Sequence, residues 1–313
     1  MAVSRPIILD TDPGHDDAFA ILAALASPGE IKVLGITTVA GNVPLEKTTY
    51  NALRLRELIS ADVPVYRGCE RPMVNDLVTA EYVHGATGLD GPILPEPTSP
   101  VESSHAVDFI IDTLLAAENR SITVCSIGPL TNVGMALVKE PAIAAKIREF
   151  VIMGGSFKEG GNVTPTAEFN IYVDPHAAHV VFSSGVPLTI MPLDVTHQAQ
   201  ATPPRVAAFR ALGSPLGEAV GAMLDFVEQF DVSYCGFEGY PLHDPTVIAY
   251  LLEPDIFTAR EAFVSVVTDA GSAHGQTIAD WIGQTGNESN SRVMLALDAD
   301  RYFALLIERL SRF

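Results

Sequence analysis

The chain has 313 residues, of which 48% are hydrophobic and 18% are charged, so it can bury a large core and is not intrinsically disordered. Its formal net charge of −19 repels nucleic-acid phosphates, which excludes a duplex-binding protein. A neutral small molecule and a cation held by carboxylates both remain compatible with this charge. No window approaches the ~18 uncharged apolar residues of a membrane span, so we expect no contact with a membrane.

The cysteines indicate the redox compartment. Cys69, Cys125 and Cys235 are widely spaced and form no C-x-x-C pair. This pattern excludes a disulfide framework and a zinc site, and it is typical of a reducing compartment. No basic region followed by a long apolar stretch precedes the first strand, so we expect no signal peptide and a cytoplasmic enzyme.

Apolar runs alternate along the chain with segments of helical periodicity. In chain order we predict strand 6–10, helix 15–26, strand 31–38, helices 45–60 and 103–118, strand 122–127, helix 130–138, strand 149–153, helix 174–184, strand 187–192, helices 203–212, 216–230 and 243–252, strands 262–268 and 292–297, and helix 299–311. Continuous apolar runs are expected of strands buried on both faces of a parallel sheet. The alternation predicts an α/β fold, doubly wound, with a mainly parallel sheet and helices on both faces.

We expect residues 1–313 to form a single domain with three long loops, at 67–101, 154–173 and 232–242. Long loops in compact domains are commonly functional, and in open α/β sheets they gather where ligands bind, at the carboxyl ends of the strands. Either Asp298 or Asp300 is placed to cap the last helix.

The strongest local signal follows the first strand, where four carboxylates, those of Asp10, Asp12, Asp16 and Asp17, fall within eight residues. Gly14 permits a tight turn, and the following apolar run starts a helix. Capping of that helix needs only one carboxylate, whereas four converging carboxylates repel each other. An oxygen-rich site that balances this charge suits Ca²⁺ or Mg²⁺.

An Asp-x-Asp pair after a strand also fits a haloacid-dehalogenase-like phosphotransferase, in which the first Asp is the nucleophile and the second an acid/base. That alternative needs a lysine to hold the phosphate, and none of the five lysines lies in an evident motif. It also leaves Asp16 and Asp17 unexplained. A third class, a non-catalytic Ca²⁺-dependent nucleoside binder, would use the same carboxylates without turnover.

Six motifs, in order, resemble the inosine–uridine-preferring nucleoside hydrolase family, and most closely its pyrimidine-preferring ribonucleoside hydrolase branch. They are Asp10–Asp17 (DTDPGHDD), Ile36–Asn42 (ITTVAGN), His84–Leu89 (HGATGL), Gly128–Asn132 (GPLTN), Met153–Gly155 with Ala167–Asn170 and Asp174–Pro175, and His243–Pro245 (HDP). The resemblance implies the nucleoside hydrolase fold with a Rossmann-like core and Ca²⁺-dependent hydrolysis of ribonucleosides to ribose and free base.

The resemblance also implies a metal site. Its ligands would be Asp12, Asp17, Asp244 and the backbone carbonyl of Ile127, with Asp10 supporting them by hydrogen bonding. Asp12 would in addition be the general base that activates a metal-bound water, which attacks through an oxocarbenium-like transition state. For Asp244 the alternative is an ordinary helix cap.

The remaining implied roles concern ribose and base. Hydrogen bonds to the ribose hydroxyls are assigned to Asp16, Asn42, Asn162, Glu168 and Asn170, and packing beside the sugar to Met153. His243 and His84 would assist the leaving base, since a histidine pKa suits proton donation near neutrality. Phe169, Tyr234, Phe237 and Tyr240 would either stack on the base or pin their loops onto the core.

The base preference follows from the same motifs. Purine-specific members of the family use a tryptophan-lined pocket, and the one tryptophan, Trp281, lies far from every matched motif. We therefore expect uridine and cytidine as substrates, with inosine as a further one. By resemblance, the partner is a small ribonucleoside rather than a nucleic acid, and the assembly is a homodimer or homotetramer.

Overall fold

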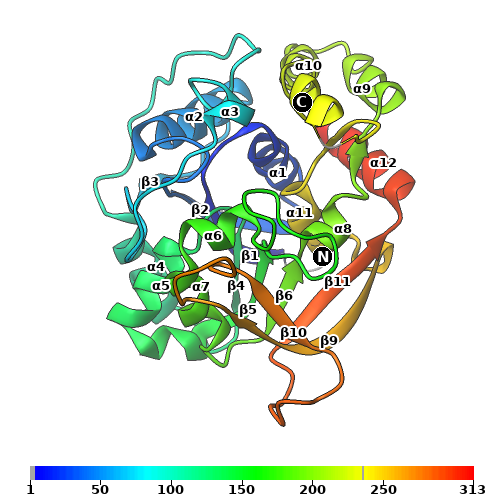
Figure 1. Ribbon diagram of the computed structural model, residues 1–313. Coiled ribbons are helices and arrows are strands. Elements are labelled where there is room, and N and C mark those ends of the chain that lie inside the picture. Colours follow the sequence, from blue (N-terminus) through cyan, green and yellow to red (C-terminus); the bar gives the residue numbers. More distant parts are fainter. Residues whose placement is uncertain (1–3, 235) are drawn as a thin grey trace.

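The computed structural model of the chain describes residues 4–234 and 236–313, with all of their side chains except those of residues 229–234. Its centre is a sheet in which nine described strands follow the order β10-β9-β11-β6-β5-β4-β1-β2-β3. The seven strands from β11 to β3 run parallel, while β9 and β10 are antiparallel to their neighbours. The predicted mainly parallel α/β sheet is thus confirmed (Figure 1).

The strands of this sheet are β1 (Arg5–Thr11), β2 (Ile31–Thr38), β3 (Val65–Arg67), β4 (Ile122–Ser126), β5 (Ile147–Met153), β6 (Leu188–Met191), β9 (Phe257–Val266), β10 (Thr277–Asp280) and β11 (Ser291–Leu297). A separate antiparallel pair joins β7 (Gln200–Ala201) to β8 (Tyr240–Pro241).

The helices are α1 (His15–Leu25), α2 (Leu45–Leu58), α3 (Glu81–His84), α4 (Ala106–Leu115), α5 (Thr131–Lys139), α6 (Phe169–Val173), α7 (Pro175–Phe182), α8 (Leu193–Thr196), α9 (Pro203–Arg210), α10 (Pro215–Tyr234), α11 (Pro245–Leu252) and α12 (Ala299–Leu310). Two short 3₁₀ helices, η1 (Pro141–Lys146) and η2 (Pro254–Ile256), follow α5 and α11. Among the residues described, no helix is both long and apolar enough to cross a bilayer.

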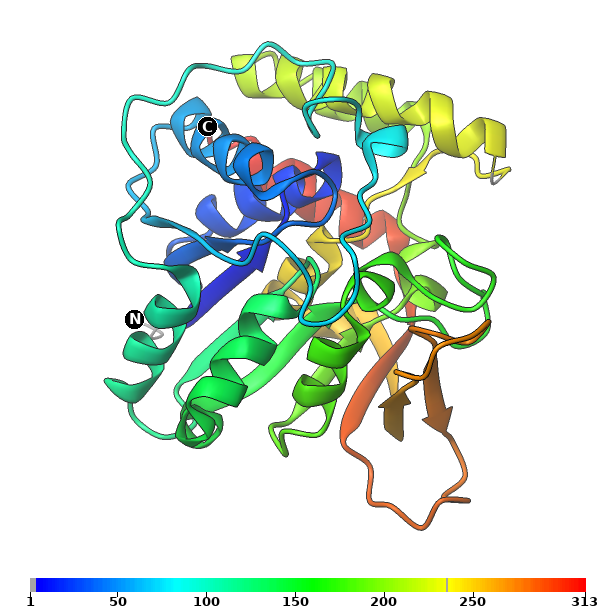
Figure 2. The same ribbon diagram turned by 60° about the vertical axis from the view of Figure 1, so that its left-hand side comes forward.

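Helices cover both faces of the sheet (Figures 1 and 2). Successive residues of β1 point to opposite faces, so Ile7 and Leu9 pack with α1, α2, α11 and α12, while Ile8 packs with α4, α5 and α7. Burial on both faces explains why the central strands are continuous apolar runs rather than alternating ones.

The predicted elements need correction mainly at the sheet's edges. The sequence predicted a strand at 262–268, but β9 begins at Phe257, and β3 and β10 were not predicted at all. The first half of β9 is largely exposed and contains the charged residues Arg260 and Glu261. Both missed strands are short and lie at an edge of the sheet. Such strands are held by backbone pairing to a neighbour, which leaves no apolar run to find.

The three predicted loops also contain regular structure. α3 lies within 67–101, α6 ends the 154–173 segment, and the 232–242 segment holds the end of α10 and strand β8. α6 is stabilised by its N-cap, because the Glu168 carboxylate accepts the N–H groups of Asn170 (2.8 Å) and Ile171 (3.2 Å). Helices this short have too few residues for a periodic apolar pattern.

The cap of α12 provides a test of the folded structure. The Asp298 carboxylate accepts the N–H of Arg301 (3.1 Å), whereas Asp300 is 94% exposed and pairs with Arg205. Asp298→Ala should lower the free energy of unfolding by about 1 kcal/mol, measured by denaturant titration. Asp300→Ala, the matched control, should cost about 0.5 kcal/mol or less. Equal losses would contradict the assignment of the cap.

Candidate active site

The candidate site lies where the strand order reverses. From β1 the chain proceeds outward to β2 and β3 on one side, and β4, β5 and β6 follow on the other. At such a switch point the loops leaving the carboxyl ends of two adjacent strands diverge and open a crevice. Asp12 follows β1 and Ile127 follows β4, so the two segments predicted to bind metal border this crevice.

The turn between β1 and α1 is built around the Asp17 carboxylate. Its Oδ1 accepts the hydroxyl of Thr11 and the N–H of Asp12 (3.2 Å), and its Oδ2 accepts the N–H of Gly14 (2.9 Å). The side-chain amide of Asn42 also donates to Oδ2 (3.0 Å). The Asp17 carboxylate therefore accepts a bond from the N-cap residue of α1, and these four hydrogen bonds fix its position.

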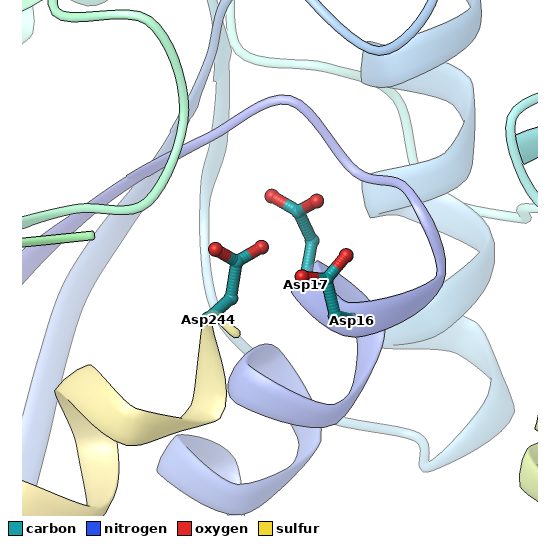
Figure 3. A group of neighbouring side chains, drawn as sticks. All are labelled: Asp16, Asp17 and Asp244. Atoms are coloured by element: carbon teal, nitrogen blue, oxygen red, sulfur yellow. The ribbon is translucent and has the colours of Figure 1, made fainter. Parts of the chain in front are cut away.

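A second carboxylate source is α11. Single ligand atoms of Asp16, Asp17 and Asp244 lie within 4.8 Å of one another, and all three residues are buried. Figure 3 shows these carboxylates gathered between the starts of α1 and α11. Asp244 occupies the N-cap position of α11 but makes no side-chain capping bond. The structure therefore disfavours the capping alternative for Asp244, and this acidic triad can hold a metal ion.

Electrostatics supports a cation at this point. Burial, reinforced by the neighbouring carboxylates, raises the pKa of Asp12 and Asp244 well above their usual range. The same two causes raise the pKa of Asp16 to about 8, and burial raises that of Asp17. Four neighbouring buried carboxylates are unfavourable unless protons or a cation neutralise them.

Asp12 occupies a space that two glycines leave open. Its Oδ2 accepts the N–H of Asn42 (2.7 Å), while its Oδ1 is buried without a hydrogen-bond partner among the described residues. A Cβ on Gly41 would lie 2.1 Å from Oδ2, and one on Gly128 would lie 2.4 Å from Oδ1. Glycine at both positions is thus required for this carboxylate. The unpartnered oxygen is what a ligand or proton acceptor would present.

Asp10 is not a member of the triad. Its carboxylate accepts hydrogen bonds from Thr37 Oγ1 (2.6 Å), Ser126 Oγ (3.1 Å) and Asn132 Nδ2 (2.8 Å). Burial raises its pKa to about 6, against the lowering effect of these three donors. The geometry matches a residue that ties the ends of β1, β2 and β4 together beneath the site.

Four of the residues predicted to contact ribose, Met153, Asn162, Glu168 and Asn170, come from β5 and the segment after it. Asn170 donates from Nδ2 to the carbonyls of Ile127 (3.0 Å) and Met153 (3.2 Å). The Glu168 carboxylate also accepts the N–H of Gly155 (2.9 Å), and burial raises its pKa to about 7. Asn162 Oδ1 accepts the N–H of Phe169 (2.9 Å). The Ile127 carbonyl therefore accepts one hydrogen bond, from Asn170, and its second lone pair can bind another ligand.

A cavity of about 440 Å³ unites these residues. From the predicted set its lining includes Asp16, Asn42, His84, Ile127, Met153, Asn162, Glu168, Phe169, Asn170, Phe237, Tyr240, His243 and Asp244. Asp12 and Asp17 lie behind this lining, with side chains fully buried. The side chain of Tyr234 lies outside the described residues.

The two predicted histidines are held differently. His84 stacks on His15 with their Nδ1 atoms 3.1 Å apart, and His15 Nε2 donates to the carbonyl of Asp90 (2.8 Å). His243 Nδ1 lies 2.7 Å from Thr196 Oγ1. Burial lowers the pKa of His84 well below its usual range and that of His243 to about 3. Both rings are therefore neutral near pH 7, contrary to the expectation of a near-neutral pKa.

Sequence reasoning missed several residues of the cavity, among them His197, Glu159 and Tyr82. His197 follows α8, which begins directly after β6. The rule that ligands bind at the carboxyl ends of strands could have singled it out. Glu159 lies on an irregular segment and Tyr82 on the four-residue helix α3, and no sequence pattern specifies the path of either.

Comparison with known proteins agrees with this geometry. The inosine-uridine preferring nucleoside hydrolase family matches residues 7–304. The chain belongs to this family. It is 46% identical to an uncharacterised protein of Schizosaccharomyces pombe over 307 residues, covering 98% of the chain and 99% of that protein. It is 44% identical to the pyrimidine-specific ribonucleoside hydrolase RihB of Escherichia coli (strain K12) over 304 residues, 97% and 96% of the two chains.

The fold is equally close to solved nucleoside hydrolases. A purine-preferring ribonucleoside hydrolase from Gardnerella vaginalis superposes with a TM-score of 0.91 at 32% identity, covering 98% of each chain. The protein is therefore a hydrolase acting on N-glycosyl bonds, with the nucleoside hydrolase fold. This excludes the phosphotransferase and the non-catalytic binder. The described residues lining the cavity also include no lysine or arginine to hold a phosphate.

Proposed function

We propose that the protein is a Ca²⁺-dependent ribonucleoside hydrolase that prefers uridine and cytidine and accepts inosine. The observation that carries this proposal is the buried triad of Asp16, Asp17 and Asp244, two of which, Asp16 and Asp244, line the same cavity as the ribose-side residues. Carboxylate and carbonyl oxygens at high coordination number are the ligands that Ca²⁺ prefers.

The metal ligands we propose are Asp12, Asp17, Asp244 and the Ile127 carbonyl, with Asp10 as their support. Asp16 is itself a member of the triad, so we extend its role from the ribose hydroxyls to the edge of the metal site. When bound, Ca²⁺ would supply a hard cation that grips the vicinal diol of the sugar and orients water.

Asp12 is the proposed general base. Its Oδ1 has no hydrogen-bond partner among the described residues, and burial with neighbouring negative charge raises its pKa, so it has high affinity for a proton. A base of this kind takes the proton of the attacking water as the C1′–N bond breaks. The positive charge that develops on the ribosyl ring is stabilised by the surrounding carboxylates.

On the ribose side we propose hydrogen bonds from Asp16, Asn42, Asn162, Glu168 and Asn170, with Met153 packing against the sugar. Glu168 is held by backbone N–H groups at Gly155 and Asn170, so its position is set before substrate binds. A site of fixed, buried polar groups rejects a sugar that lacks a hydroxyl, because one group is then left unpaired.

The leaving base is assisted by His243 and His84. Because both rings are neutral near pH 7, they act as positioned hydrogen-bonding groups rather than as preformed imidazolium acids. Thr196 fixes the ring of His243, and His15 fixes that of His84. Phe169, Phe237 and Tyr240 line the same cavity and can stack on the base.

Two observations support the pyrimidine preference. The relative named pyrimidine-specific shares 44% identity over nearly the whole chain, against 32% for the purine-preferring structure. Trp281 packs on Phe157 and Arg260 and is not among the residues lining the cavity. We retain as further proposals a single domain over residues 1–313, a homodimer or homotetramer, and a cytoplasmic location.

The direct test is release of ribose from uridine, cytidine and inosine, followed with a reducing-sugar assay. We expect turnover with added Ca²⁺ and its loss with a chelator, restored when excess Ca²⁺ is returned. Turnover that persists in chelator would sink the metal assignment. Faster cleavage of inosine than of uridine would reverse the base preference.

The pH dependence of the protein's stability should reveal whether a metal is bound at the carboxylates. Burial and mutual repulsion raise the carboxyl pKa values of the folded state, that of Asp16 to about 8. Without metal the folded state then binds more protons than the unfolded state, so stability falls as pH rises from about 4 to about 8. A bound cation offsets this loss and competes with protons at low pH.

We therefore expect Ca²⁺ to raise the midpoint of thermal unfolding more at about pH 8 than at about pH 5.5. At a free Ca²⁺ concentration of about 100 Kd the gain should approach 2.7 kcal/mol. Scanning calorimetry with Ca²⁺ or chelator at both pH values measures it. A gain that is equal at the two pH values, or larger at the lower one, would contradict the buried carboxylate site.

A further inference from the structure

The cavity has a second polar feature besides the acidic triad, formed by His197 and Glu159. The ring of His197 lies 4.9 Å from that of Phe237 and 5.8 Å from that of His243, measured between centroids. All four residues line the cavity. His197 thus belongs to the wall shared with the histidine proposed to assist the leaving base.

Glu159 is aimed at His197 by a defined frame. The Asp194 carboxylate accepts the N–H groups of Phe157 and Lys158, each at 2.8 Å, immediately before Glu159. Asp194 lies on α8, and His197 follows the last residue of the same helix. The helix therefore fixes His197 and, through Asp194, the segment that carries Glu159. Glu159 Oε2 then lies 3.5 Å from His197 Nδ1.

Gln200 links the segment that carries Phe237 to His197. Its side-chain N–H donates to the carbonyl of His197 (3.0 Å), and its Oε1 accepts the N–H of Glu238 (2.9 Å), next to Phe237. Asp194 and Gln200, which do not line the cavity themselves, therefore fix the relative positions of Phe237, His197 and Glu159. Such a supporting layer is what positions groups for recognition.

The chemistry of the pair follows from the ring's two nitrogens. Nδ1 is buried and makes no hydrogen bond among the described residues, and the carboxylate oxygen at 3.5 Å attracts a proton to it. Burial lowers the pKa of His197, which favours the neutral ring with one proton. With that proton on Nδ1, Nε2 is a hydrogen-bond acceptor.

We propose that Glu159 and His197 determine base specificity: Glu159 keeps the ring proton on Nδ1, and Nε2 accepts a hydrogen bond from an N–H group on the outer edge of the nucleobase. Uracil and hypoxanthine offer a ring N–H there and cytosine an amino group. Glu159 is the positioning residue, and His197 makes the contact. This inference rests on the proposed ribonucleoside hydrolysis in the same cavity.

A double-mutant cycle between enzyme and substrate tests the pair. Glu159→Gln keeps the size of the side chain but removes its charge, and its amide can donate to Nδ1 and reverse the ring's tautomer. 3-Methyluridine replaces the ring N–H of uridine by a methyl group. We expect Glu159→Gln to lower kcat/KM for uridine about tenfold, mainly through KM, and to change that for 3-methyluridine less than about twofold.

His197→Phe keeps the ring and its packing on Phe237 but has no acceptor, so it should reproduce the loss for uridine. Adding Glu159→Gln to it should then cost nothing more. Glu288→Gln, which removes one charge from an exposed loop, is the control and should match the wild type. Thermal unfolding midpoints establish that each variant is folded.

The proposal is overturned if Glu159→Gln lowers kcat/KM equally for both substrates, or if neither variant changes their ratio. Failure of the proposed function would look different, as an absence of ribose release by the wild-type enzyme with Ca²⁺. In that case the Kd values of the same variants for uridine and 3-methyluridine, measured by calorimetry, still test whether Glu159 and His197 recognise the base.

Discussion

Asp12→Asn is expected to lower kcat by at least about 10³-fold while the protein remains folded. A positioned general base contributes about 10² to 10⁴ in rate, and asparagine cannot take up a proton. The substitution also weakens a proposed metal ligand. Its cost in stability should be small, because burial and nearby carboxylates already disfavour the charge on Asp12. The measurements are kcat for uridine at saturating Ca²⁺ and the midpoint of thermal unfolding.

Asp10→Asn is the matched control, two residues earlier and equally buried. The Asp10 carboxylate accepts from Thr37, Ser126 and Asn132, so an amide there would place a donor against a donor. Its main effect should be on stability. The broken buried network should lower the free energy of unfolding by about 1–3 kcal/mol, seen as a lower unfolding midpoint. If Asp12→Asn keeps more than about a tenth of the wild-type kcat at saturating Ca²⁺, Asp12 is not the base.

The sequence predicted the central fold because its signals there are local. The signals for β1 and α1 are an apolar run, a turn at Gly14 and a second apolar run. Each of these signals is carried by residues that are neighbours in the chain. The same local signals place Asp12 and Asp17 in the turn between β1 and the first residues of α1. Bringing Asp244 to them required the family resemblance, since no periodicity relates the start of α1 to the start of α11.

The remaining features depend on tertiary contacts that leave no mark on a single segment. Strand β10 is held by pairing with β9, and α6 by the Glu168 cap. The pair formed by His197 and Glu159 depends on Asp194 binding a loop that comes from another strand. Asp16 was assigned only to ribose, because one helical turn shows where its backbone lies and not which neighbours its carboxylate meets.

The second large effect is expected at Asp244, whose position separates metal binding from folding. Asp244 stands at the N-cap of α11 without capping it, and Pro245 at the first helical position starts the helix independently. Asp244→Asn should therefore leave the unfolding midpoint of the metal-free protein unchanged or higher, since a buried repelling charge is removed. Its effect should fall on Ca²⁺ affinity.

We expect the Kd for Ca²⁺ to rise at least about 100-fold in Asp244→Asn, because even residues that only support metal ligands cost 10–100-fold when replaced. Calorimetric titration measures Kd directly, and kcat is then followed against Ca²⁺ concentration. Turnover should recover at high Ca²⁺ in Asp244→Asn and stay low in Asp12→Asn, because only the second variant lacks the base. Unchanged Ca²⁺ affinity in Asp244→Asn would remove α11 from the metal site and leave the carboxylates of α1 to bind the ion alone.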